Sequence, residues 1–106
     1  MKRSEFYKFV KEKTENLLQL LERKAKEYAK EDSAFHNFNE GFMLSTCHSR
    51  EEYCWNLRVK HLQSIKDIIE AQVKNRPNIE LIDEKFGDDL AYNLLIWAML
   101  AENSDL

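Results

Sequence analysis

Apolar residues recur at steps of three and four along three long stretches of the chain, which is the spacing of one face of an α-helix. This pattern predicts helices over about residues 4–31, 50–75 and 79–102. Ser4 is the expected N-cap of the first helix, and Ser49 with Glu52 has the spacing of a capping box before the second. The Arg76-Pro77 pair is expected to end that second helix, because proline disfavours helical geometry in the residue before it.

Residues 32–49 show no clear period and form an aromatic-rich connector. Phe35, Phe38 and Phe42 are expected to attach it to the core, and a short helix is predicted over about residues 39–46. No stretch alternates with a period of two. The predicted fold is therefore all-α: one helical domain over residues 1–106, in which a long N-terminal helix and the connector precede an antiparallel pair of long helices.

The last helix is apolar on every side in its second half, where Asn93 is the one polar residue between Leu90 and Glu102. The apolar side chains on every side of such a helix need to be buried by other helices, so it is either central in a bundle or part of an oligomer interface. We expect a homodimer or a higher homo-oligomer, with dimerisation completing the bundle.

Composition excludes several classes of protein. The chain has 106 residues, 43% hydrophobic and 33% charged, with a net charge of −3 and both signs interspersed, which does not favour binding to duplex nucleic acid. No apolar run reaches the roughly 18 residues of a membrane span, and no apolar segment follows the N-terminal charges as in a secretory signal. We expect a cytoplasmic protein with reduced Cys47 and Cys54. Cys54 falls on an apolar helix face and is predicted to pack in the core, whereas a zinc site with His48 and His61 would lack a paired C-x-x-C.

Charged groups on apolar helix faces are the candidate functional residues. Arg58 falls near the centre of the apolar face of the 50–75 helix and His61 at its edge, while Lys60, Ser64 and Asp67 point outward. The expected buried stripe of that helix consists of Leu57, Leu62, Ile65, Ile68, Ile69 and Val73. The last helix has two apolar stripes, one of Ile82, Phe86, Leu90 and Trp97 and one of Leu81, Leu95 and Met99.

Three acids, Glu84, Asp88 and Asp89, flank the apolar stripes of the last helix and offer partners to Arg58 and His61. Two interpretations stay open, an ion-pair network that fixes the helix register and a ligand or metal pocket between the helices. In the second, Glu84 and Asp88, one turn apart, would bind Mg²⁺, which prefers oxygen ligands. The cations nearby would then neutralise phosphate oxygens; they are Arg58, Lys60 and His61.

Three segments resemble a known family. AKEYAKEDSAFHNF (25–38), RVKHLQSIKDII (58–69) and EKFGDDLAYNLLIWAML (84–100) are similar to the nucleotide-modification-associated domains of phages and prophages, which look distantly like MazG-type all-α nucleoside-triphosphate pyrophosphatases. The resemblance implies a protein that binds a (deoxy)nucleotide with Mg²⁺ and hydrolyses a phosphate ester or anhydride. It places His36 and Asn37 at the nucleoside, and Asp67 or Glu52 as an extra carboxylate, while Lys85 stands where the pyrophosphatase pattern has a glutamate.

Three functions follow from these patterns. The first is a nucleotide-handling enzyme, the second is a noncatalytic phage or mobile-element binding module, and the third is a helical assembly protein whose last helix supplies an oligomer interface. The sequence does not decide whether the chain is an enzyme.

Overall fold

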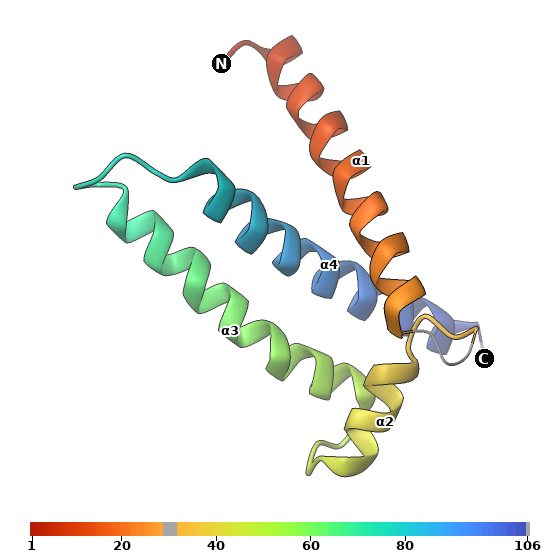
Figure 1. Ribbon diagram of the computed structural model, residues 1–106. Coiled ribbons are helices and arrows are strands. Elements are labelled where there is room, and N and C mark those ends of the chain that lie inside the picture. The colour runs from red at the N-terminus through yellow and green to blue at the C-terminus, as the bar shows by residue number, and fades with distance from the viewer. Residues whose placement is uncertain (29–31, 106) are drawn as a thin grey trace. The chain divides into compact units, whose positions relative to one another are not determined.

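The described part of the chain folds into helices and the loops that join them (Figure 1). The structure is a computed structural model that describes residues 1–28 and 32–105. Its helices are α1 (Arg3–Tyr28), α2 (His36–Leu44), α3 (Arg50–Ala71) and α4 (Ile79–Ser104), and no strand occurs among the residues described. The predicted all-α class is confirmed.

Two compact units divide the chain, Met1–Ala34 with α1 and Phe35–Leu106 with α2, α3 and α4. Within the second unit, α3 and α4 run antiparallel and side by side, and α2 packs against α3 (Figure 1). The predicted antiparallel pair of long helices is confirmed. One domain over residues 1–106 stays a prediction.

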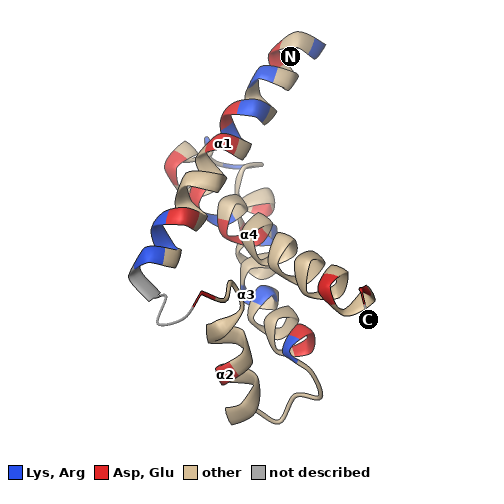
Figure 2. Cartoon of the chain, turned by 90° about the vertical axis from the view of Figure 1, so that its right-hand side faces the viewer, with Lys and Arg blue, Asp and Glu red and all other residues tan. Residues whose placement is uncertain are grey.

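Helix α1 of the first unit is amphipathic and has both signs of charge along its length (Figure 2). It begins at Arg3, so the prediction of Ser4 as its N-cap is wrong. The carboxylate of Glu5 instead accepts a hydrogen bond from the Lys2 backbone N–H at 3.0 Å, which satisfies one of the donors that a helix start leaves open. The predicted end at residues 29–31 lies outside the described residues.

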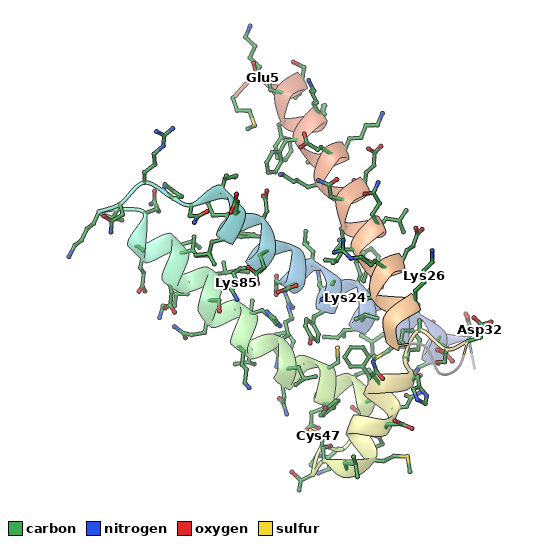
Figure 3. The ribbon with its side chains drawn as sticks, in the orientation of Figure 1. Glu5, Lys24, Lys26, Asp32, Cys47 and Lys85 are labelled. Carbon is green, nitrogen blue, oxygen red and sulfur yellow. The ribbon has the colours of Figure 1, made fainter. Side chains whose placement is uncertain are left out.

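Helix α2 begins three residues before its predicted start at 39 and ends at Leu44. Ser45 closes it, because its hydroxyl donates to the Phe42 carbonyl at 2.7 Å and accepts from the Cys47 N–H at 3.1 Å. Figure 3 shows Cys47 in the loop that follows. The ring of Tyr53 on α3 lies where a side chain at Gly41 would be, so α2 approaches α3 closely at this glycine.

The caps of α3 and α4 explain where both helices start. The Ser49 hydroxyl accepts from the Glu52 N–H at 3.0 Å, as predicted. The Glu52 carboxylate accepts from the His48 N–H at 3.2 Å, so the capping box is not closed reciprocally. Asn78, which was not predicted as a cap, accepts from the N–H groups of Glu80 and Leu81 and caps α4.

Helix α3 ends at Ala71, four residues before its predicted end at 75. The N–H groups of Lys74 and Asn75 both donate to the Ala71 carbonyl, which makes a turn of residues 72–75. A short connection of this kind brings the next helix back along α3.

The face that α3 turns toward α4 differs from the predicted stripe. Cys54 and Met99 are fully buried, so the packing predicted for Cys54 is confirmed. Ile69 and Val73 are exposed, so their predicted burial is wrong. Residues from the two apolar stripes of α4 are exposed as well; they are Leu81, Phe86, Leu90 and Trp97. Polar side chains occupy part of the contact between the helices, and this turns one apolar stripe of each helix outward.

None of the helices in residues 1–28 and 32–105 combines the length and the apolar character needed to cross a bilayer. Figure 2 shows that the second half of α4 is nearly free of charge until its end.

Candidate functional site

A polar layer lies between α3 and α4; its members are Arg58, His61, Asp88, Asp89 and Tyr92. Arg58 holds Asp89 through two hydrogen bonds, Nε to Oδ1 at 2.7 Å and Nη2 to Oδ2 at 3.3 Å. The two side chains are 18% and 14% exposed, so water screens the pair only in part. The hydrogen bonds to Asp89 raise the pKa of Arg58 further, so the guanidinium is permanently charged.

The second contact of the layer joins an imidazole to a carboxylate. His61 Nδ1 lies 3.9 Å from Asp88 Oδ2, and both side chains are more than three-quarters buried. The imidazole ring also packs on the ring of Tyr92, with centroids 4.9 Å apart. Burial, together with the nearby negative charge of Asp88, raises the pKa of the Tyr92 hydroxyl, which therefore stays protonated.

Glu84 lies outside the polar layer. Its side chain is 62% exposed and approaches Lys85 at 3.9 Å, whereas Asp88 turns toward His61. Among the described residues, no three of His, Cys, Asp and Glu gather closely enough to hold a metal ion. An Mg²⁺ ion at Asp88 would need ligands from a nucleotide or from a second chain, so the predicted Mg²⁺ site stays a prediction.

The predicted nucleoside residues lie at the start of α2. His36 approaches Glu40 one turn later at 3.4 Å, and Asn37 is exposed. The aromatic rings around them contact the protein itself. Phe38 meets the edge of Tyr92 with centroids 6.0 Å apart, and Phe35 lies 4.9 Å from the guanidinium of Arg50. The core role predicted for these two rings is consistent with the contacts.

The remaining predicted residues lie apart from the polar layer. Lys60 is exposed on α3. Glu52 lies in the first turn of α3, where its carboxylate accepts a hydrogen bond from the His48 backbone N–H and lies 3.2 Å from His48 Nδ1. Asp67 accepts a hydrogen bond from Gln63 at 2.9 Å and lines a pocket one turn further along the hairpin.

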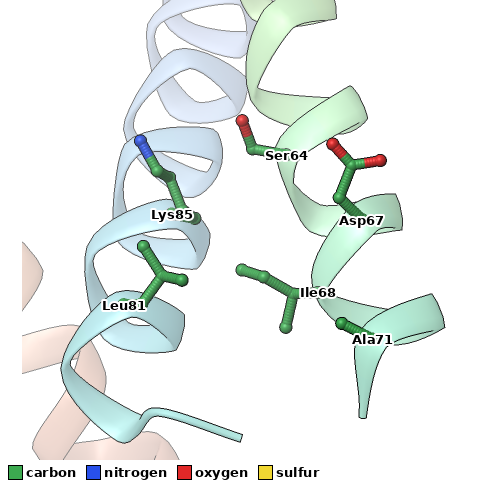
Figure 4. A pocket seen from close by; sticks show the side chains of 6 residues that line it. All are labelled: Ser64, Asp67, Ile68, Ala71, Leu81 and Lys85. Carbon is green, nitrogen blue, oxygen red and sulfur yellow. The ribbon is translucent and has the colours of Figure 1, made fainter. Parts of the chain in front are cut away.

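This pocket is an open hollow of about 320 Å³ between the two helices (Figure 4). Ile68 and Leu81 point toward each other across it. Ser64 was predicted to point outward but is half-buried, and its hydroxyl donates to the Lys60 carbonyl at 3.1 Å. No part in a pocket was predicted for Lys85, although its place one turn before Asp89 on the α3 side of α4 brings it there. The lining residues are Ser64, Asp67, Ile68, Ala71, Leu81 and Lys85.

A second polar cluster, centred on Arg50, joins three helices at the other end of the hairpin. Arg50 Nη2 donates to Glu102 at 3.4 Å and to Asn103 at 3.2 Å on α4, and Nη1 donates to Asn39 on α2 at 3.4 Å. Glu51 accepts from Asn103 at 2.8 Å. The helix pattern placed Arg50 only at the start of α3, so no signal in the sequence pointed to this cluster.

Comparisons with family models, with curated proteins and with solved structures find no match to this chain. The resemblance to nucleotide-modification-associated domains therefore remains a prediction from the three segments that carry it.

Proposed function

We propose that the chain is a helical assembly module, of the kind that phages and mobile elements encode, whose copies associate through α4. The observation that supports this function is an apolar outward face on α4, the side turned away from α3. Six large apolar residues on this face are at least 40% exposed. They are Ile79, Phe86, Leu90, Leu94, Trp97 and Leu100. Several large apolar side chains exposed on one face of a helix are typical of an interaction site.

In this function the polar layer has a structural role. Arg58 and His61 are matched by Asp89 and Asp88 on the facing helix. These pairs fix α4 against α3 and hold the outward face in one position for its partner. Arg58 and Asp89, with His61 and Asp88, contact one another within the hairpin, so these four polar groups do not lie on the outward face.

Sedimentation equilibrium over a range of protein concentrations tests this function. Wild type is expected to associate, and Leu90→Glu, which places a charge in the outward face, is expected to sediment as a monomer. Val73→Glu is the matched control, because Val73 is an exposed apolar residue in the turn after α3. A wild type with the monomer mass at every concentration would overturn the proposal.

A second candidate function is binding of a nucleotide that brings its own Mg²⁺. The observation that favours it is the pocket beside the polar layer, which presents the ammonium of Lys85 and the hydroxyl of Ser64 over an apolar floor. An ammonium is a point charge that binds phosphate oxygens, and apolar walls suit a base. The resemblance of the chain to nucleotide-modification-associated domains points to the same ligand class.

A thermal-shift measurement with nucleoside triphosphates tests the second candidate. With Mg²⁺ present, the melting temperature is expected to rise, and Lys85→Met is expected to lose the rise. Lys66→Met is the control, since Lys66 is an exposed lysine of α3 that approaches Glu70 at 3.9 Å and does not line the pocket. An unchanged melting temperature with every nucleotide at millimolar concentration would rule this function out.

A further inference from the structure

The outward face of α4 contains a regular seam. Residues along it are separated by four and three positions in turn, the spacing of the core positions of a coiled coil. Every member is exposed. The α4 seam consists of Ile79, Asp83, Phe86, Leu90, Asn93, Trp97 and Leu100.

Two polar residues interrupt the α4 seam, Asp83 near its start and Asn93 beyond its middle. In coiled coils, a polar residue at a core position selects the register and orientation that give it a polar partner, at a cost in stability. The positions of Asp83 and Asn93 therefore specify which partner the seam accepts.

A second copy of α4, placed antiparallel across a two-fold axis near residue 88, sets a polar residue opposite each polar residue of the seam. In that register Asp83 faces Asn93 of the second copy, and Asn93 faces Asp83 of the second copy. Phe86 then faces Leu90 of the second copy, and Ile79 faces Trp97 of the second copy. From Ile79 to Trp97, polar residues meet polar residues and apolar residues meet apolar residues, so this part of the seam is self-complementary.

Two other arrangements of a pair of α4 helices are less favourable, because each gives Asp83 or Asn93 an unfavourable neighbour in the second copy. A parallel pair in register would set Asp83 against Asp83 of the second copy, which brings like charges together. An antiparallel pair shifted by one heptad, with Phe86 facing Trp97 of the second copy, would set Leu90 against Asn93. That shift buries an amide against an apolar side chain, which costs free energy because the amide loses its hydrogen bonds with water.

We propose that two copies of this chain pair through antiparallel α4 seams and that a hydrogen bond from the Asn93 amide to the Asp83 carboxylate across the interface sets their register. The pairing rests on the proposed assembly function and names its arrangement. Two hairpins joined in this way form a four-helix bundle, and the paired part of the seam is about 27 Å long at 1.5 Å per residue.

The experiment is a charge change and its reversal in the full chain, measured by sedimentation equilibrium with helix content followed by circular dichroism. Asn93→Asp sets a new carboxylate of one copy against Asp83 of the other at both ends of the two-fold interface. We expect the dimer dissociation constant to rise at least about tenfold. The double variant Asp83→Asn with Asn93→Asp restores an amide opposite each carboxylate and is expected to return the dissociation constant to within about threefold of wild type.

Asp83→Asn alone separates the two orientations. In a parallel pair it would remove the facing carboxylates and strengthen association, whereas in the antiparallel pair it relieves no repulsion and is not expected to tighten the dimer. Asn75→Asp, an equal charge change in the exposed turn after α3, is the control and is expected to leave association unchanged.

Three results would overturn the arrangement. A dimer that Asn93→Asp leaves intact would show that Asn93 does not face Asp83 of the second copy, and a dimer that weakens without recovering in the double variant would show a different register. Both leave the assembly function standing, whereas a monomeric wild type removes the assembly function together with this arrangement.

Discussion

Arg58 and Asp89 meet midway along the contact between α3 and α4, where two hydrogen bonds of 2.7 and 3.3 Å join the guanidinium to the carboxylate. This paired geometry requires both groups to lie in one plane at one distance, so it tolerates little sliding of one helix along the other. A slip of one helical turn would separate the charges by about 5 Å and leave each of them half-buried without its partner. The pair thus determines the register of the hairpin, and it also determines which side of α4 faces outward.

Asp89→Asn is expected to lower the free energy of unfolding by about 2 to 3 kcal/mol, because it leaves the Arg58 charge half-buried without a carboxylate. Urea unfolding measures the change. Glu84→Gln is the control, since Glu84 is largely exposed and a surface substitution changes stability by about 0.5 kcal/mol or less. The double variant Arg58→Met with Asp89→Leu is expected to be less destabilised than Asp89→Asn, because no charge is left behind. Equal losses in both variants would contradict this account.

Gly41→Ala is expected to lower the free energy of unfolding by about 1 kcal/mol or more, even though alanine favours helices. The added methyl group would overlap the end of the Tyr53 ring, so α2 must shift away from α3. Gly87→Ala is the matched control, because nothing lies within 4 Å of the new methyl group, so only the higher helix propensity of alanine changes the free energy of unfolding. We expect it to raise stability by about 1 kcal/mol. If Gly41→Ala were as stabilising as Gly87→Ala in urea unfolding, the close contact with Tyr53 would be excluded.

Local pattern predicted most of the helices, because three- and four-residue periodicity depends only on neighbouring residues. The start of α3 after Ser49 and the start of α4 at Ile79 are confirmed. Pattern also placed Arg58 in the interhelical face, opposite acids on the last helix.

Long-range packing accounts for most of what the sequence did not predict. A helical wheel takes the most apolar side as buried, but two polar pairs occupy part of the α3–α4 contact, so Ile69 and Trp97 point outward. The pocket lined by Lys85 and the cluster around Arg50 depend on residues that meet only after the helices pair. Such contacts have no signature in the spacing of one helix.

The two cysteines are expected to differ in reactivity toward a thiol reagent near neutral pH. Cys54 is fully buried, and burial raises the pKa of its thiol to about 11, so the reactive thiolate is scarce. Cys47 is half-buried in the loop after α2, with its sulfur 3.4 Å from the Asn56 amide. A time course of thiol labelling should show a fast phase that Cys47→Ser removes and a slow phase that Cys54→Ser removes.

The raised pKa of Cys54 also affects stability at high pH. The unfolded chain loses the Cys54 proton near pH 9.0, before the folded chain does, so the unfolded state is favoured as the pH rises from 9.0 toward 11. Cys54→Ala is expected to show a weaker loss of stability over this range than wild type. Rapid labelling of both thiols in the native protein, or an identical pH dependence in Cys54→Ala, would contradict the burial of this group.

Glu51 is expected to make stability depend on acid pH. Burial acts to raise the pKa of its carboxyl, but hydrogen bonds from its own backbone N–H, from Asn103 and from Arg50 outweigh burial and hold the pKa below 4.5. The unfolded chain therefore takes up this proton first as the pH falls, so the stabilisation by Glu51 is complete above pH 4.5 and is lost as the pH falls through the folded pKa.

Urea unfolding of wild type and Glu51→Gln at several pH values measures this dependence. The free energy of unfolding of wild type should exceed that of Glu51→Gln by about 1 kcal/mol near neutral pH. This difference should shrink below pH 4.5. Asn103→Ala removes the 2.8 Å hydrogen bond to Glu51. Its free energy of unfolding should therefore fall less than that of wild type as the pH is lowered. A difference between wild type and Glu51→Gln that stayed constant from neutral to acid pH would mean that the carboxylate at the junction of α3 and α4 does not stabilise the folded chain through its charge.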